Sequence, residues 1–276
     1  MFKRLPTSIG ASDKNRDGWH KLHNKMNRPD EFFIPDNEVK LSEELDYGRA
    51  DLYISAVDAL SRTSCQSVYI IDYFKRDFLY VSPNRFFLCG LSQERVRELG
   101  YRFYLDHVPE GELPLLLTIN RAGFAFYEGI PVKERKEWYI SYDFHILDNG
   151  RKTLVNHKMT PLELTSDGRI WLALCVVTAA THADAGHIEM HHAGTSDFYE
   201  YNVVSRKWKK KRMPVLTDGE KSVLMLSIQG YTMAEIADRI CLSPDTVKKY
   251  RQRIFVKLNV RNVSEAIVAA TNSKLL

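Results

Sequence analysis

The chain has few cysteines and no long hydrophobic run. Its four cysteines, Cys65, Cys89, Cys175 and Cys241, are scattered without C-x-x-C spacing, which favours reduced thiols over disulfides or a zinc motif. No window reaches the roughly 18 apolar residues that a membrane-spanning helix needs. The first residues are basic but no apolar stretch follows them, so we expect no signal peptide. These absences favour a cytoplasmic protein that makes no membrane contact.

Catalytic motifs are also missing. The sequence has no nucleophile elbow, no phosphate-binding glycine loop and no isolated carboxylate pair, so we do not expect an enzyme. His187, His191 and His192 have an i, i+4 spacing that would suit a metal on a helix. Gly186 and Gly194 disfavour that helix, and we expect a solvated loop and no metal site there.

Positive charge is concentrated in the C-terminal quarter. The whole chain has a formal net charge of +4, whereas residues 206–261 carry 14 Lys and Arg against 5 Asp and Glu. The rest of the chain is therefore acidic. A basic segment on an acidic body indicates that one part meets nucleic acid and the other part does something else.

The first 54 residues predict an arm and helices. Residues 1–37 are polar and basic with few periodic apolar positions, so we expect them to be irregular or partly ordered. From Asp36 to Leu60 the apolar residues recur at helical intervals and predict one or two helices.

Residues 55–180 carry the pattern of an antiparallel sheet. Runs rich in β-branched and aromatic residues predict five strands at residues 67–72, 78–84, 138–146, 152–164 and 170–177. Helical patterns at 92–100 and 112–126 lie between the second and third strands. In 138–146 the even positions are all apolar, so we expect one face to be buried and the other to be partly wet.

This order of elements resembles the PAS sensor fold. The resemblance lies in Val68–Asp72, Tyr80–Asn84, Gly90–Glu94 and Phe103–His107. It implies an α+β domain with a five-stranded antiparallel sheet and flanking helices. The alternative is an unrelated α+β domain with the same element order.

The cofactor and the signal of such a domain are left unknown by the sequence. Four residues are candidates to line a cavity or simply to fill it: Trp138, Tyr142, Phe144 and Cys175. Three histidines are candidates for haem but fit core or surface positions as well: His107, His145 and His157. Cys89 does not sit in the Asn-Cys-Arg-Phe motif of flavin-binding relatives. The signal is a small molecule or a protein, and an interaction module without a ligand is the rival.

Residues 181–214 are expected to link two domains. The segments 197–203 and 207–213 predict a small hairpin or an extended linker. The lysine-rich run that begins at Lys207 faces either solvent or DNA phosphate.

Residues 215–276 predict an all-α domain. Thr217-x-x-Glu220 and Thr232-x-x-Glu235 are capping boxes that mark two helix starts. Ser243-Pro244 marks a third, and Asn262 or Ser264 marks a fourth. The second and third helices are separated by about three residues, which is typical of a helix-turn-helix.

These positions closely resemble the LuxR-type four-helix DNA-binding domain. The match is carried by Leu216-Thr217-x-x-Glu220, by Glu235-Ile236-Ala237, and by Leu242-Ser243-x-x-Thr246-Val247-Lys248-x-Tyr250. It implies base contacts from the third helix and phosphate or backbone contacts around it. The implied base-reading residues are Lys248, Lys249 and Gln252, with Arg253 on the same outward face. The implied backbone-facing residues are Thr246, Lys257, Thr217 and Thr232.

The sequence also departs from the family pattern. Gly219 and Ala234 replace a usual Arg and a usual Lys or Asn, Ser222 replaces a usual Glu, and Tyr250 replaces the frequent His. Arg251 lies near the apolar stripe, so we expect it to flank the core rather than to read bases.

The partners that follow from this resemblance are double-stranded DNA and a second copy of the chain. The last helix is the usual dimerisation surface of the family, so we expect a homodimer on an inverted repeat. A one-component transcription regulator is the leading hypothesis. A receptor of the acyl-homoserine-lactone type is an alternative, although its aromatic and Asp spacing is not found.

Overall fold

The computed structural model describes residues 28–40, 45–273 and 275. Most of the irregular arm expected over residues 1–37 lies outside this range. Its described part contains two short 3-10 turns, η1 (Pro29–Phe32) and η2 (Pro35–Asn37). Phe32 and Ile34 are buried in the main core, so this stretch packs on the domain instead of extending from it.

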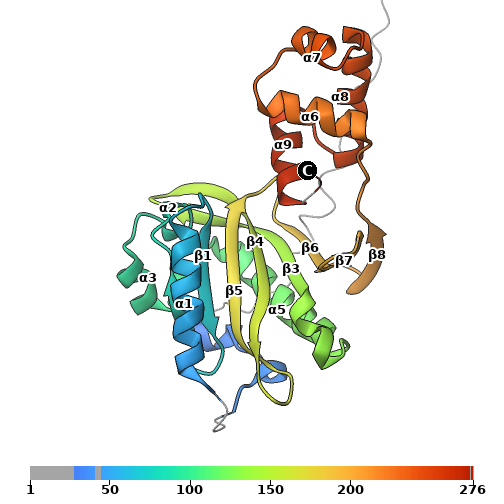
Figure 1. The fold of residues 1–276 in the computed structure, drawn as a ribbon. Helices are drawn as coiled ribbons and strands as arrows, with labels where there is room; N and C mark the ends of the chain where they lie inside the picture. The colour runs from blue at the N-terminus through green and yellow to red at the C-terminus, as the bar shows by residue number, and fades with distance from the viewer. Residues whose placement is uncertain (1–27, 41–44, 274, 276) are drawn as a thin grey trace, which may run out of the picture.

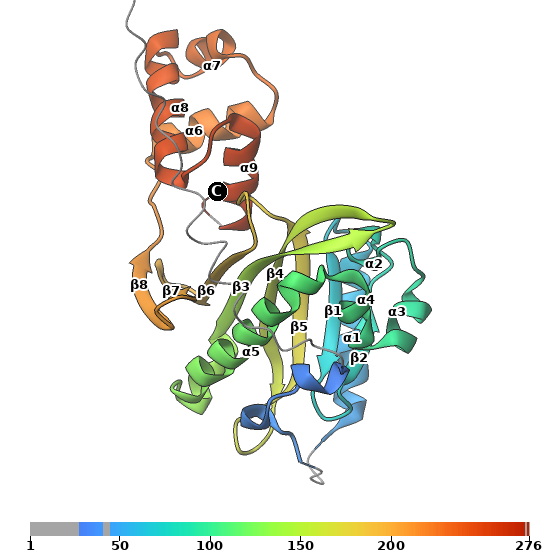
Figure 2. The ribbon, with the colours of Figure 1, turned by 180° about the vertical axis from the view of Figure 1, so that it is seen from behind.

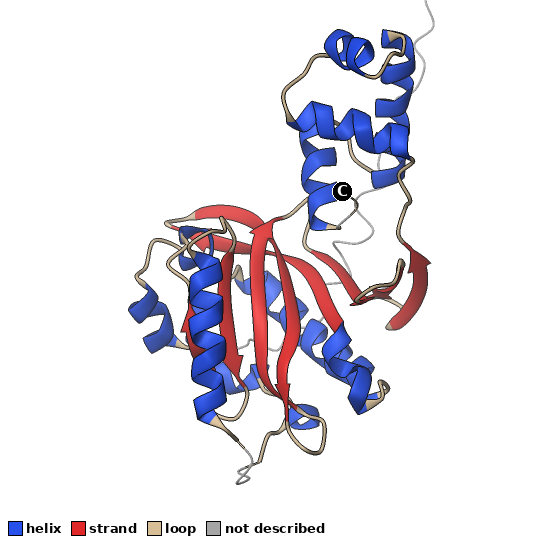
Figure 3. Ribbon diagram, in the orientation of Figure 1, coloured by secondary structure: helices blue, strands red, loops and turns tan. Residues whose placement is uncertain are grey.

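Eight strands form one antiparallel sheet in the order β2-β1-β5-β4-β3-β6-β7-β8 (Figure 3). The strands are β1 (Ser67–Asp72), β2 (Asp77–Val81), β3 (Trp138–Asp148), β4 (Arg151–Leu164), β5 (Ile170–Ala179), β6 (Gly186–His192), β7 (Asp197–Asn202) and β8 (Lys207–Arg212). The first five are the strands predicted from the sequence, and β7 with β8 is the predicted hairpin.

The prediction of a solvated loop around residues 184–195 is wrong, because β6 occupies this stretch and pairs with β3. Ile188 and Met190 are fully buried, and they alternate with polar residues as a half-buried strand requires. Gly186 and Gly194 have positive φ; the first begins the strand and the second lies two residues beyond its end. Residues 181–214 thus extend the sheet and do not form a free linker.

Helices cover both faces of the sheet. Helix α1 (Tyr47–Ser61) lies on one face, over β1 and β5, and packs on Val68, Ile70 and Trp171 (Figure 1). The domain boundary expected after residue 54 falls inside this helix.

The other face carries α5 and three short helices (Figure 2). They are α2 (Arg85–Leu88), α3 (Gln93–Leu99), α4 (Arg102–His107) and α5 (Leu113–Glu128), with 3-10 turns η3 (Glu110–Glu112) and η4 (Val132–Glu137). The main core lies between these helices and the sheet. The helices expected at 92–100 and 112–126 are α3 and α5. Among the described helices, none is long and apolar enough to cross a lipid bilayer.

Four helices form the C-terminal bundle: α6 (Asp218–Ile228), α7 (Met233–Arg239), α8 (Pro244–Leu258) and α9 (Val263–Asn272). The bundle has a core of its own that includes Val223, Ile236, Val247 and Ile254. It follows β8 in the chain (Figure 1). The end of α9 meets the sheet, because Lys158 Nζ donates to Asn272 O at 2.7 Å and Asn272 Nδ2 donates to Ala179 O at 3.4 Å.

Candidate functional site

Helix α8 begins where its capping residues predict. The Ser243 hydroxyl accepts a hydrogen bond from Thr246 N at 3.1 Å, and Pro244 takes the first helical position. Thr217 with Glu220 and Thr232 with Glu235 form complete capping boxes at the starts of α6 and α7. The three predicted helix starts are therefore present.

A tight turn joins α7 to α8. Cys241 adopts a left-handed conformation at φ 54°, and Leu242 N donates to Ala237 O at 2.9 Å. This bond closes the end of α7 in the manner of a Schellman-type cap, so the chain reverses within four residues. The two helices form a helix-turn-helix with α8 as its second helix.

The outer face of α8 is basic. Lys248, Lys249, Gln252 and Arg253 are exposed, and no acidic residue follows Asp245 in the helix. Val247 and Ile254 point into the bundle core and are fully buried. Arg251 is half-buried, at the flank position expected for it.

Val256 belongs to the same outer face and was missed in the sequence. It is 81% exposed and follows Lys249 and Gln252 at helical spacing, near the middle of the face. Its position about 180° from Val247 on the helical wheel was the signal that places it outside.

Lys257 is engaged within the bundle. Its Nζ donates to Glu220 Oε2 at 2.6 Å and to Val215 O at 2.8 Å. Burial raises the pKa of Glu220, but the hydrogen bonds from Lys257 and Thr217 and the charge of Lys257 together outweigh burial, so the net pKa is lowered. The hydroxyls of Thr217 and Thr232 cap their own helices, and Thr246 Oγ1 lies 2.9 Å from Ser243 Oγ.

Gly219 and Tyr250 lie against each other. A Cβ atom built on Gly219 would stand 2.9 Å from Tyr250 Cζ and 3.0 Å from its hydroxyl oxygen. Real Cβ atoms essentially never come that close to another heavy atom. Two departures from the LuxR-type pattern are thus one contact, in which the tyrosine ring occupies the space of a side chain at position 219.

A cluster of buried hydroxyls and an imidazole lies in the core of the sheet domain. The Tyr69 hydroxyl bonds to the Tyr104 hydroxyl and lies 2.5 Å from His157 Nε2. Burial lowers the pKa of His157 to about 3, so its imidazole is neutral at neutral pH. His157 Nδ1 is buried without a hydrogen-bond partner among the described residues.

Three of the four cavity candidates lie around this cluster. The Tyr142 ring is 4.7 Å and the Phe144 ring 6.0 Å from the His157 ring, and Cys175 pairs with Tyr69 across β1 and β5. Trp138 lies elsewhere, because its ring packs on Phe126 in α5 at 5.3 Å. The other haem candidates are engaged apart from the cluster: His107 Nδ1 lies 2.9 Å from Leu147 O, and His145 Nδ1 lies 2.8 Å from Glu112 Oε1.

Comparisons with known proteins support the assignment of the helical bundle as a DNA-binding domain of the LuxR type. Residues 214–270 match the family model of bacterial regulatory proteins, luxR family. The DNA-binding transcriptional activator DevR/DosR of Mycobacterium tuberculosis is 39% identical over 24% of this chain and 30% of its own length. The oxygen regulatory protein NreC of Staphylococcus aureus is 23% identical over 49% of this chain and 58% of its own length. The chain thus covers between 30% and 58% of the length of these two relatives.

Solved structures show weaker similarity. A crystal structure of the phage VqmA–DPO complex aligns with 83% of this chain and 91% of its own, at 18% identity and a TM-score of 0.32. The assignment of the first domain therefore rests on its strand order and covering helices and not on this alignment. The chain joins a PAS-like antiparallel sheet domain to a C-terminal domain of the luxR family of bacterial regulatory proteins.

Proposed function

We propose that the protein is a one-component transcription regulator that inserts α8 into the major groove of DNA. The observation that carries this proposal is the exposed row Lys248, Lys249, Gln252 and Arg253 on the second helix of a helix-turn-helix. Lys and Gln side chains hydrogen-bond base edges, and Lys and Arg displace counterions from phosphates. A regulator that binds chromosomal DNA acts in the cytoplasm.

The test compares base-reading variants with a matched variant on the same helix. Sites are selected from random duplexes by the full chain, and affinities for single-base changes are measured for Lys248→Ala, Gln252→Ala and Arg251→Ala. We expect Lys248→Ala and Gln252→Ala to relax the preference at particular positions by about 1–3 kcal/mol per contact. Arg251→Ala should keep the base preference of the wild type. Unchanged preferences in the first two variants would mean that α8 does not read the bases.

The proposed DNA-bound form is a homodimer that uses α9. Val263 and Ile267 are half-buried and Val268 is 36% exposed, so this helix keeps apolar surface after the bundle has formed. Ala270, three residues after Ile267 on the same side of the helix, is fully buried in the core of its own bundle. Sedimentation with a selected duplex should give two chains per duplex, and Val268→Glu should give one.

The proposed sensory site is the cluster around Tyr69 and His157. Buried polar groups need partners, and His157 Nδ1 has none among the described residues. A small ligand would supply that partner, as an acceptor or a donor according to the tautomer of the imidazole. Native mass spectrometry of the purified chain tests this, because a bound molecule appears as added mass in the wild type and is lost in Tyr69→Phe. A protein-interaction module without a ligand, the rival, predicts the bare mass of the chain.

A further inference from the structure

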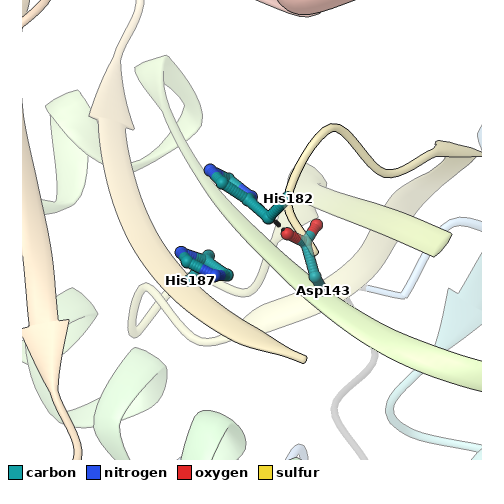
Figure 4. A group of neighbouring side chains, drawn as sticks. All are labelled: Asp143, His182 and His187. Carbon is teal, nitrogen blue, oxygen red and sulfur yellow. Dashed lines mark hydrogen bonds and ion pairs between the residues drawn. The ribbon is translucent and has the colours of Figure 1, made fainter. Parts of the chain in front are cut away.

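Three potential metal ligands meet at the point where the chain passes from β5 to β6. They are Asp143 on β3, His182 in the connection and His187 at the start of β6 (Figure 4). One ligand atom from each lies within 4.8 Å of the other two. His182 Nδ1 lies 2.5 Å from Asp143 Oδ2, and the two imidazole rings stack with centroids 3.7 Å apart.

Asp143 is a buried carboxylate on the face of β3 that was expected to be partly wet. The residue is 0% exposed, and its partner His182 has a side chain that is 37% exposed. Asn156 Nδ2 donates to Asp143 Oδ1 at 2.8 Å, while Asn156 Oδ1 is buried and has no partner among the described residues. Buried carboxylates are paired or coordinate metals, and this site has an unused buried oxygen beside the carboxylate.

The geometry lies within reach of coordination. Ligand atoms at about 2.0–2.1 Å from a tetrahedral zinc ion stand about 3.3 Å from one another. The Asp143–His182 pair is closer than that because a proton lies between the two atoms, and a metal ion would replace this proton. His182 and His187 are partly exposed, so their rings have room to turn out of the stack and to point at one ion.

We infer that Asp143, His182 and His187 bind a divalent transition metal of the zinc class, with water at the remaining position. Two imidazoles and one carboxylate suit zinc, and they leave the open position that a three-ligand site has. Each metal ion bound displaces the proton shared by Asp143 and His182.

The spacing that suggested a metal in the sequence is not the one that the fold brings together. His191 Nε2 lies 2.9 Å from Glu189 Oε2, and His192 Nε2 lies 3.0 Å from Glu137 Oε2. His187 has φ 48°, and its ring stacks on that of His182 while its Nε2 lies 3.0 Å from Asp184 Oδ1. His191 therefore provides a matched control on the same strand.

The location of the site ties it to the helical bundle. The connection from β5 to β6 passes beside the end of α9 in both ribbon views (Figures 1 and 2). Asn272 in α9 bonds to Ala179, three residues before His182. Metal binding would fix the connection to β3 at the junction of the two domains.

The test is a zinc titration of the full-length chain after removal of metal with a chelator. Calorimetry should give one strong site per chain, and cobalt in its place should give a visible d–d absorption band. His182→Ala and His187→Ala should weaken binding by at least about 10-fold, the lower end of what disturbing a metal site costs. His191→Ala should bind as the wild type does. His20 and His23 are present in every variant, so any binding by them is common to all.

Two results would overturn the proposal. One is a wild type without a saturable site. The other is an affinity that stays unchanged in both His182→Ala and His187→Ala, or that falls equally in His191→Ala. Because His182 is exposed, we do not expect His182→Ala to unfold the chain, so weaker zinc binding by this variant reports on the site itself. The far-ultraviolet circular dichroism of each metal-free protein checks this directly.

Discussion

The buried imidazole of His157 makes the stability of the sheet domain depend on pH. Its pKa is lowered by burial from 6.5 to about 3 in the folded chain. Between these values the unfolded chain takes up a proton that the folded chain does not bind. The stabilisation is therefore complete above pH 6.5 and is lost as the pH falls toward 3. From pH 7 to pH 5 this one group should lower the free energy of unfolding by about 2 kcal/mol.

Tryptophan fluorescence isolates the domain in which this loss occurs. Trp19, Trp138, Trp171 and Trp208 all precede residue 215, so the helical bundle contributes no tryptophan signal. Urea unfolding is followed at pH 7 and at pH 5 for the wild type and for His157→Gln, whose amide keeps a hydrogen-bonding group near Tyr69. The variant should lose about 2 kcal/mol less than the wild type between these two pH values.

The control variant separates burial from hydrogen bonding. Tyr69→Phe removes the hydroxyl that lies beside His157 Nε2 but leaves the imidazole buried. Because burial is the cause of the lowered pKa, this variant should keep the acid-dependent loss. Equal losses in the wild type and in His157→Gln would refute the reasoning.

Three further predictions concern the helical bundle. Gly219→Ala gains about 1 kcal/mol of helix propensity, but its new methyl group meets the Tyr250 ring at a cost of about 1–3 kcal/mol. In thermal unfolding it should therefore stabilise the bundle only in a Tyr250→Ala background, and equal effects in both backgrounds would contradict the contact. Lys257→Ala leaves the carboxylate of Glu220, which is 1% exposed, without its cation. This should destabilise the bundle by about 1–3 kcal/mol in urea unfolding followed by circular dichroism. Unchanged stability with weaker DNA binding would mean that Lys257 serves only to contact phosphate. Val256→Asp should change the stability of the bundle by less than about 0.5 kcal/mol, because the side chain is exposed. It should weaken DNA binding in a mobility-shift assay by more than about 10-fold, because the carboxylate repels phosphates. Wild-type affinity would show that Val256 does not lie in the DNA interface.

Local patterns predicted most of the fold. Capping boxes and strand alternation depend on neighbours in sequence, and they located the strands β1 to β5 and the helix starts at Thr217, Thr232 and Ser243. The loop expected at 184–195 failed for a physical reason. Glycine and histidine suggested exposure, while the burial of Ile188 and Met190 depends on the distant strand β3.

Contacts between distant elements were the part that the sequence did not reveal. Lys257 meets Glu220 across the bundle, and Gly219 meets Tyr250. Trp138 was named with Tyr142 as a cavity candidate, but the long strand β3 places Tyr142 beside His157 in the core and Trp138 beside Tyr199 of β7. His182 carried no signal at all, since its role depends on the fold bringing it to Asp143.

Selection of binding sites from random duplexes by the full chain tests the central claim most directly. The account predicts an enriched inverted repeat whose half-sites are centred about 10–10.5 base pairs apart. It also predicts an affinity for that site that falls steeply as salt is raised. A pool without any enriched sequence, or an affinity that does not change with salt, would contradict the claim that the basic face of α8 reads DNA.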